Sequence, residues 1–135
     1  MYKKLALLFG AVFFLVGLMG FVPNTLVGPA GFFETNTAHN FVHLLFGILL
    51  AACGMTDEKT ASLALVISGA MYLLVGMAGM VATGNAHGAM LFDTIHVNRA
   101  DNWLHLLLGV ILVGAGTARK WMAVSGGSRP EFRLP

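Results

Sequence analysis

Long apolar stretches separated by short polar ones dominate the pattern of this chain. Four stretches carry no charged residue, namely 5–22, 35–56, 60–83 and 102–118. Each is about as long as the roughly 17–25 residues that an α-helix needs to cross the hydrocarbon core of a bilayer. The pattern therefore predicts four transmembrane helices, over about 4–22, 37–55, 61–81 and 100–118, with a short polar turn between the second and the third.

The same polar residues return at matching places in two of these stretches. The sequence Asn40-Phe-Val-His43-Leu-Leu-Phe-Gly47 has a counterpart in Asn102-Trp-Leu-His105-Leu-Leu-Leu-Gly109. Residues 10–17 and 69–76 also resemble each other, and both begin and end with glycine. This self-similarity predicts a duplicated unit of two helices, with repeat one at about 4–55 and repeat two at about 60–118. Because each unit holds an even number of helices, both copies are expected to cross the membrane in the same direction.

The expected fold is an all-α transmembrane four-helix bundle built from two tandem parallel repeats of a helical hairpin. It forms one membrane domain over residues 1–121, and residues 122–135 are expected to be a flexible C-terminal tail. Small residues on one helix face allow close approach in lipid, or else offer a docking face to another protein. Bundle packing is the favoured interpretation for Gly10, Gly17, Gly47, Gly69, Gly76 and Gly109.

Composition and charge support a membrane protein. The chain is 57% hydrophobic and only 10% charged, against about a quarter charged in soluble domains. In a four-pass topology almost all lysines and arginines fall on one side, and only Arg99 falls on the other. This asymmetry predicts a multi-pass protein of the cytoplasmic membrane with both termini in the cytoplasm. The chain has no basic face with interleaved aromatic residues, so nucleic acid is not an expected partner.

The histidines are the candidate chemistry. His39 and His43 share one helix face, and Asp101 and His105 share the equivalent face of the related helix. Three imidazoles and a carboxylate could hold a zinc or copper ion. Alternatively, His43 and His105 could be the axial ligands of a haem.

A structural interpretation of these residues is favoured, because the spacing alone is a weak ligand signal. Asn40 and Asn102 stand in the first turns of their helices, where backbone N–H groups need acceptors. Together with His43 and His105 they could form a symmetric polar clamp near the membrane surface. His87 and His96 fall in a loop and are expected to be solvated.

No catalytic arrangement is visible, so the protein is not expected to be an enzyme. The serines lie away from the histidines in this topology, and no glycine-rich phosphate loop is present. Cys53 is the only cysteine and is expected to pack as a small apolar residue. Several aromatic side chains are expected to face lipid or a partner, namely Phe13, Phe14, Phe46, Tyr72 and Trp103.

The two Asn-x-x-His-Leu-Leu-x-Gly segments resemble those of the DUF4383 family of small bacterial four-helix membrane proteins. The resemblance covers the chain as far as Trp121 and implies a protein of the bacterial inner membrane, with no activity to transfer. The leading functional expectation is a structural or accessory subunit without catalysis, packing in the lipid bilayer against other membrane protein subunits or as a homo-oligomer. The alternative is a haem- or metal-binding protein for electron transfer or sensing that uses the repeat-related histidines.

Overall fold

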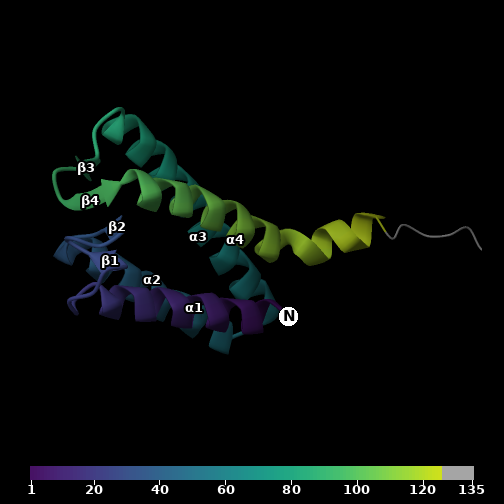
Figure 1. Cartoon of the computed structure of the whole chain (residues 1–135). Helices are drawn as coiled ribbons and strands as arrows, with labels where there is room; N and C mark the ends of the chain where they lie inside the picture. The colour runs from purple at the N-terminus through teal and green to yellow at the C-terminus, as the bar shows by residue number, and fades with distance from the viewer. Residues whose placement is uncertain (126–135) are drawn as a thin grey trace, which may run out of the picture.

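The computed structural model describes the backbone of residues 1–125 and the side chains of residues 1–118. Four long helices make up most of this part of the chain (Figure 1), namely α1 (Tyr2–Met19), α2 (Thr37–Met55), α3 (Glu58–Thr83) and α4 (Arg99–Ser125). All four contain a stretch long and apolar enough to cross a membrane, which confirms the predicted four-helix membrane architecture. The helix boundaries differ in detail from the expected ones. In particular, α1 ends at Met19, and α4 continues to Ser125, beyond the expected start of the tail.

Side-chain caps fix where two of the helices begin. The side chain of Asn36 accepts a hydrogen bond from the His39 backbone N–H at 3.0 Å and so starts α2. The carboxylate of Asp57 accepts from the N–H groups of Lys59 and Thr60 and so starts α3. Such caps satisfy N–H groups that have no partner within the helix. As a result, His39 lies in the first turn of α2, at the end of the bundle.

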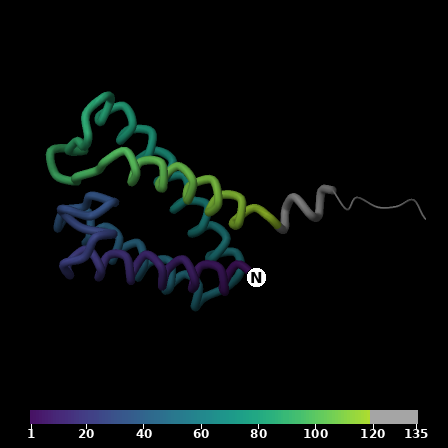
Figure 2. Tube along the Cα trace, in the orientation of Figure 1, coloured from purple at the N-terminus to yellow at the C-terminus, as the bar shows by residue number. Residues whose placement is uncertain are grey.

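The helices pack as two hairpins. α1 lies along α2, and α3 lies along α4, whereas α1 and α4 touch only sparsely. Figure 2 shows the two pairs as separate halves, and α3 is the helix through which its pair contacts both α1 and α2. A Cβ atom at Gly10 would lie 2.7 Å from the Ala51 nitrogen, and one at Gly69 would lie 2.7 Å from the Val113 nitrogen. Glycine is therefore required at both crossings. The duplication inferred from the sequence stays a prediction, but close contacts do occur at corresponding positions.

Aromatic residues fill the space between the two halves. The rings of Phe13 and Tyr72 stack with centroids 4.8 Å apart and planes at 5°. Both side chains are buried, so the expectation that they face lipid was wrong. Phe14 and Trp103 are exposed, as expected. In a membrane protein both the core and the surroundings are apolar, so apolarity alone does not reveal which face of a helix points inward.

Short strands, which the sequence pattern did not predict, close one end of the bundle. β1 (Val27–Gly28) pairs in parallel with β2 (Phe33–Glu34), and β3 (Gly88–Leu91) pairs antiparallel with β4 (Ile95–Asn98). We call residues 24–36 and 84–98 the loop cover, and it lies at the end of the bundle away from the N-terminus (Figure 1). The Asn36 side chain donates to the Thr94 carbonyl at 2.7 Å, and Asn98 donates to the Phe32 carbonyl at 2.9 Å. The loops of both halves therefore form one layer.

Candidate metal centre

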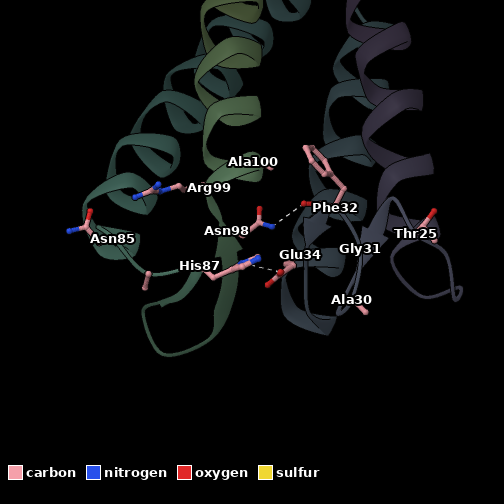
Figure 3. A pocket seen from close by; sticks show the side chains of 11 residues that line it. Thr25, Ala30, Gly31, Phe32, Glu34, Asn85, His87, Asn98, Arg99 and Ala100 are labelled. Atoms are coloured by element: carbon pink, nitrogen blue, oxygen red, sulfur yellow. Dashed lines mark hydrogen bonds and ion pairs between the residues drawn. The ribbon is translucent and has the colours of Figure 1, made fainter.

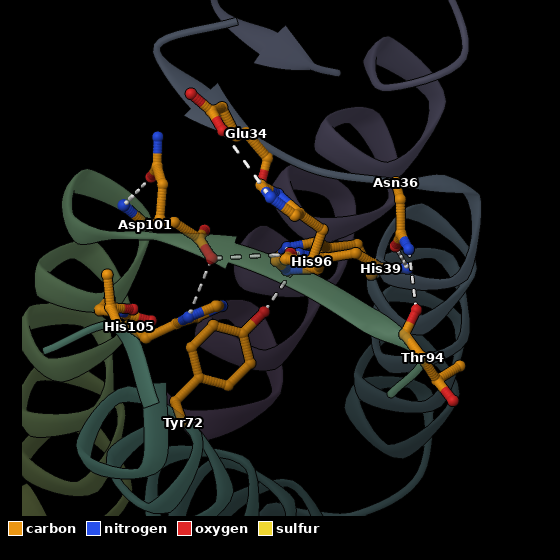
Figure 4. Close-up of polar contacts among 12 residues, drawn as sticks. Glu34, Asn36, His39, Tyr72, Thr94, His96, Asp101 and His105 are labelled. Atoms are coloured by element: carbon orange, nitrogen blue, oxygen red, sulfur yellow. Dashed lines mark hydrogen bonds and ion pairs between the residues drawn. The ribbon is translucent and has the colours of Figure 1, made fainter. Parts of the chain in front are cut away.

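Three histidines meet beneath the loop cover. His39 and His43 come from α2, and His105 comes from α4; Figure 4 labels His39 and His105. Their side chains are at least nine-tenths buried, with exposed fractions of 3%, 7% and 4%. One ring nitrogen of each lies within 4.8 Å of the others. Among the described residues, no other group of three histidine, cysteine or acidic side chains is arranged to hold a metal ion. We call these three residues the histidine trio.

The local helix geometry produces this arrangement. His39 and His43 are one turn apart on α2, and their rings stack with centroids 4.8 Å apart. The His105 ring lies 5.5 Å from that of His39 and 6.1 Å from that of His43. The pair that the sequence predicted to be equivalent, His43 and His105, is thus brought together, and His39 joins it.

Hydrogen bonds fix the ring orientations of His39 and His43. His39 Nδ1 donates to the His96 carbonyl oxygen at 2.7 Å, because a carbonyl can only accept. His39 Nε2 therefore carries no proton in the neutral ring and accepts from His43 Nε2 at 3.1 Å. His43 Nδ1 is then left to accept from the Tyr72 hydroxyl, also at 3.1 Å. Tyr72, His43 and His39 thus form a row of hydrogen bonds, in which each side chain donates to the next one nearer the loop cover.

Asp101 lies beside the other face of the trio. Its Oδ2 atom is 3.5 Å from His105 Nδ1 and 3.9 Å from His39 Nδ1. Within the described part of the chain, neither Asp101 Oδ2 nor His105 Nδ1 has a hydrogen-bond partner. The Asn98 side chain accepts from the Asp101 backbone N–H at 2.9 Å and so holds the start of α4 in place. The carboxylate is therefore fixed between two imidazoles.

The donor set suits a transition-metal ion. Two imidazole nitrogens bound to one tetrahedral zinc ion stand about 3.3 Å apart, close to the 3.1 Å between the Nε2 atoms of His39 and His43. Metal-bound histidines usually have their second nitrogen held by a carboxylate, a carbonyl or another polar group. The trio has these partners in Asp101, the His96 carbonyl and Tyr72.

A haem does not fit between the predicted axial ligands. The His39 ring packs against both His43 and His105, and the Tyr72 ring lies 4.9 Å from that of His105. A porphyrin between His43 and His105 would have to displace the rings of His39 and Tyr72. The packing therefore favours a single ion over a macrocycle.

The two asparagines of the predicted clamp lie within their own hairpins. Asn40 packs against Gly20, and Asn102 packs against Gly79. The Asn102 side chain donates to the Thr83 hydroxyl at 2.9 Å. Among the described residues, no hydrogen bond joins either asparagine side chain to a histidine. The structure thus brings together the two histidines of the clamp and leaves the asparagines beside the glycines.

Sequence reasoning missed two contributors to this region. Tyr72 was expected to face lipid, although it occupies the position of Phe13 in the similar segments 10–17 and 69–76 and differs from it by a single hydroxyl group. That polar substitution in an apolar segment was the available signal. His96 was expected to be solvated, but its backbone carbonyl orients His39, and no sequence pattern predicts such a backbone contact.

A second polar group lies in the loop cover, at the surface. Glu34 Oε1 is 3.2 Å from His87 Nδ1, and Glu34 Oε2 is 3.8 Å from His96 Nε2. Glu34 and His87, together with Asn98 and Arg99, line an open pocket of about 800 Å³ (Figure 3). His87 is 80% exposed, so this pair is in contact with solvent and is weaker than a buried one.

Comparison with known proteins places the chain in a family. Searches of curated proteins and of solved structures gave no match. The model of the family described as Domain of unknown function (DUF4383) matches residues 3–118, which include the histidine trio and all four candidate membrane spans except the first residue of α1. The chain therefore belongs to the family described as Domain of unknown function (DUF4383).

Proposed function

We propose that this membrane protein binds one transition-metal ion, zinc or copper, through His39, His43 and His105. The observation that carries the proposal is the convergence of three buried ring nitrogens within 4.8 Å of one another. Imidazole is a common ligand for both metals. The lone Cys53 lines a different pocket, between α2 and α3, so the site offers no thiolate.

The unpaired atoms around the trio support an ion over a hydrogen-bond network alone. Hydrogen bonding accounts for both ring nitrogens of His39 and of His43. It leaves His105 Nδ1 and Asp101 Oδ2 with no hydrogen bond among the described residues and with a contact to each other at 3.5 Å, and a buried polar group without a hydrogen bond costs about 1–3 kcal/mol. If His105 binds an ion through its other ring nitrogen, its Nδ1 carries the proton and can donate it to the Asp101 carboxylate.

Metal binding would move the proton of His43 from one ring nitrogen to the other. In the metal-free row, His43 carries its proton on Nε2 and accepts from Tyr72 at Nδ1. To use Nε2 as a ligand, His43 must carry the proton on Nδ1 and donate to the Tyr72 oxygen instead. Tyr72 serves both arrangements because a hydroxyl both donates and accepts.

Metal titration of purified protein tests this proposal. Protein in mild detergent is stripped with a chelator and titrated with Zn²⁺, and separately with Cu⁺ under reducing conditions. We expect one ion per chain in the wild type and in the control His87→Asn, whose side chain is exposed. Loss of a residue that only hydrogen-bonds a metal ligand weakens metal binding about 10–100-fold. His43→Asn and His105→Asn each remove a ligand itself, so each should weaken binding by more than this. Equal affinity in all four proteins would refute the site.

We also propose that the protein has no catalytic activity of its own and acts as an accessory subunit or a homo-oligomer in the cytoplasmic membrane, with both termini in the cytoplasm. A groove of about 350 Å³ between α2 and α3 supports a partner helix, because its lining is apolar and includes the exposed side chains of Leu49 and Leu63. Co-purification from native membranes in mild detergent tests this role. A chain that always runs as a monomer would contradict it.

A further inference from the structure

An apolar cavity of about 220 Å³ lies between the two hairpins, beside the histidine trio. Its walls come mainly from α1 and α4, the two helices that touch only sparsely, and include Val12, Val16, Leu104 and Leu108. Val12 is 42% exposed. In a bilayer, this side of α1 would face lipid, so the cavity is placed for access from the membrane rather than from water.

Three of the described residues that line this cavity carry a buried polar atom without a hydrogen bond. Thr35 Oγ1, Asp101 Oδ2 and His105 Nδ1 belong to residues that line it, and none has a hydrogen-bond partner within the described part of the chain. The exposed fractions of these residues are only 2%, 2% and 4%. The other two buried side-chain atoms without partners belong to Asn40 and Asn102, which pack against glycines elsewhere. Unsatisfied buried groups are rare in native proteins, so three such residues around one cavity make it a candidate ligand site, although Asp101 Oδ2 and His105 Nδ1 also lie 3.5 Å from each other.

The chemistry of the lining defines the ligand. The apolar walls disfavour ions and sugars, since their polar groups would lose hydration without compensation. A hydrocarbon chain would fill the walls but leave the three polar atoms unpaired. A hydroxyl group both donates and accepts, so it can pair with Thr35, Asp101 or His105 whichever of them carries the proton. The volume suits one ring rather than a large multi-ring molecule.

We propose that this cavity binds a membrane-dissolved phenol or quinol, with the ring between α1 and α4 and the hydroxyl at Thr35, Asp101 and His105. Binding there does not require a metal ion, but the cavity shares Asp101 and His105 with the proposed metal site, so its test is made on chelator-treated protein. A ligand there would also fill the sparse contact between the two hairpins.

Binding of two matched probes tests the proposal on chelator-treated protein in detergent. The probes are 4-pentylphenol and pentylbenzene, which differ only in the hydroxyl group, and binding is measured by calorimetric titration. We expect the phenol to bind at least about 10-fold more tightly, because a site built for a hydroxyl rejects an analogue without it. Thr35→Val keeps the side-chain shape and should reduce phenol affinity several-fold without changing that for pentylbenzene.

A pair of neighbouring variants on α4 locates the site. Leu108→Phe places a larger ring in the cavity and should abolish phenol binding, whereas Leu107→Phe, at a 58% exposed position, should leave it unchanged. Because overpacking can prevent folding, circular dichroism and elution volume are compared, and Val16→Phe fills the same cavity from α1. Equal affinity for both probes, or equal loss in both leucine variants, would overturn the proposal. The same variants should still bind metal, so the result for the phenol site can be judged separately from the result for the metal site.

Discussion

At the scale of single residues, one hydroxyl group links the aromatic core to the histidine trio. Tyr72 stacks on Phe13 with its ring and bonds His43 with its oxygen at 3.1 Å. The ring and the hydroxyl therefore have separable roles. The ring contributes packing between the hairpins, and the hydroxyl fixes the orientation of the imidazole.

Replacement of Tyr72 by phenylalanine should separate these roles. The variant keeps the ring stacked on Phe13 and loses the partner of His43 Nδ1, so metal affinity should fall about 10–100-fold. Titration of wild type and variant with the same metal measures this change, and circular dichroism verifies that both are folded. An affinity within twofold of the wild type would show that the hydroxyl does not position His43.

At the scale of helices, glycine sets how closely the members of each hairpin approach. A Cβ atom at Gly109 on α4 would lie 2.7 Å from Leu73 Cγ and 2.9 Å from the Gly69 carbonyl oxygen on α3. Gly114, on the same helix, has no atom within 4 Å of the corresponding position. Replacement by alanine would therefore change helix propensity equally at the two positions, but only at Gly109 would the added methyl group meet neighbouring atoms.

Substitution of these two glycines by alanine should give opposite outcomes. Gly109→Ala should lower the free energy of unfolding by about 1–3 kcal/mol, because a methyl group is forced into a filled contact. Gly114→Ala should be neutral or slightly stabilising, since alanine favours the helix and meets nothing. Unfolding in detergent mixtures measures both. A loss of the same size in both variants would contradict the packing explanation.

The first turn of α3 carries a pH-sensitive cap. Hydrogen bonds from the Thr60 hydroxyl and the Thr60 N–H lower the pKa of Asp57 from its ordinary value of 3.8. A lowered pKa means that the carboxylate form is favoured in the folded state. Its stabilising effect is therefore complete above the unfolded pKa and is lost as the pH falls through the folded pKa.

Asp57→Asn provides the matched test of this cap. Asparagine also caps helices well but does not titrate. The melting temperature of the wild type should therefore fall more steeply than that of the variant as the pH is lowered from about 5 to about 2. If the melting temperatures of the two proteins fall in parallel as the pH is lowered across this range, the Asp57 cap makes no pH-dependent contribution.

At the scale of the whole molecule, the sequence predicts the architecture better than it predicts the site. The four charge-free stretches give the four helices, and the matched motifs identify His43 and His105 as partners. The strands escaped prediction because they are short: β1 and β2 span only two residues each, too few to show an alternating pattern, and β3 and β4 span four each, the shortest length at which such a pattern can be read.

The burial of Phe13 and Tyr72 escaped prediction for a different reason. A helix between lipid and an apolar core shows little contrast between its faces, so periodicity cannot orient it. The site depends on this orientation, because Tyr72 reaches His43 only when its face of α3 points inward. The i, i+4 spacing of His39 and His43 was readable from the sequence, whereas their approach to α4 depends on how the two hairpins pack.

The loop cover has a consequence for the speed of metal exchange. Its two halves are joined by the bonds of Asn36 to Thr94 and of Asn98 to Phe32, and its His96 carbonyl holds His39 directly. An ion bound below could pass to water on that side only when these bonds open together. Release should therefore follow the opening rate of the cover, so that the protein would retain its ion for longer than the equilibrium affinity alone suggests.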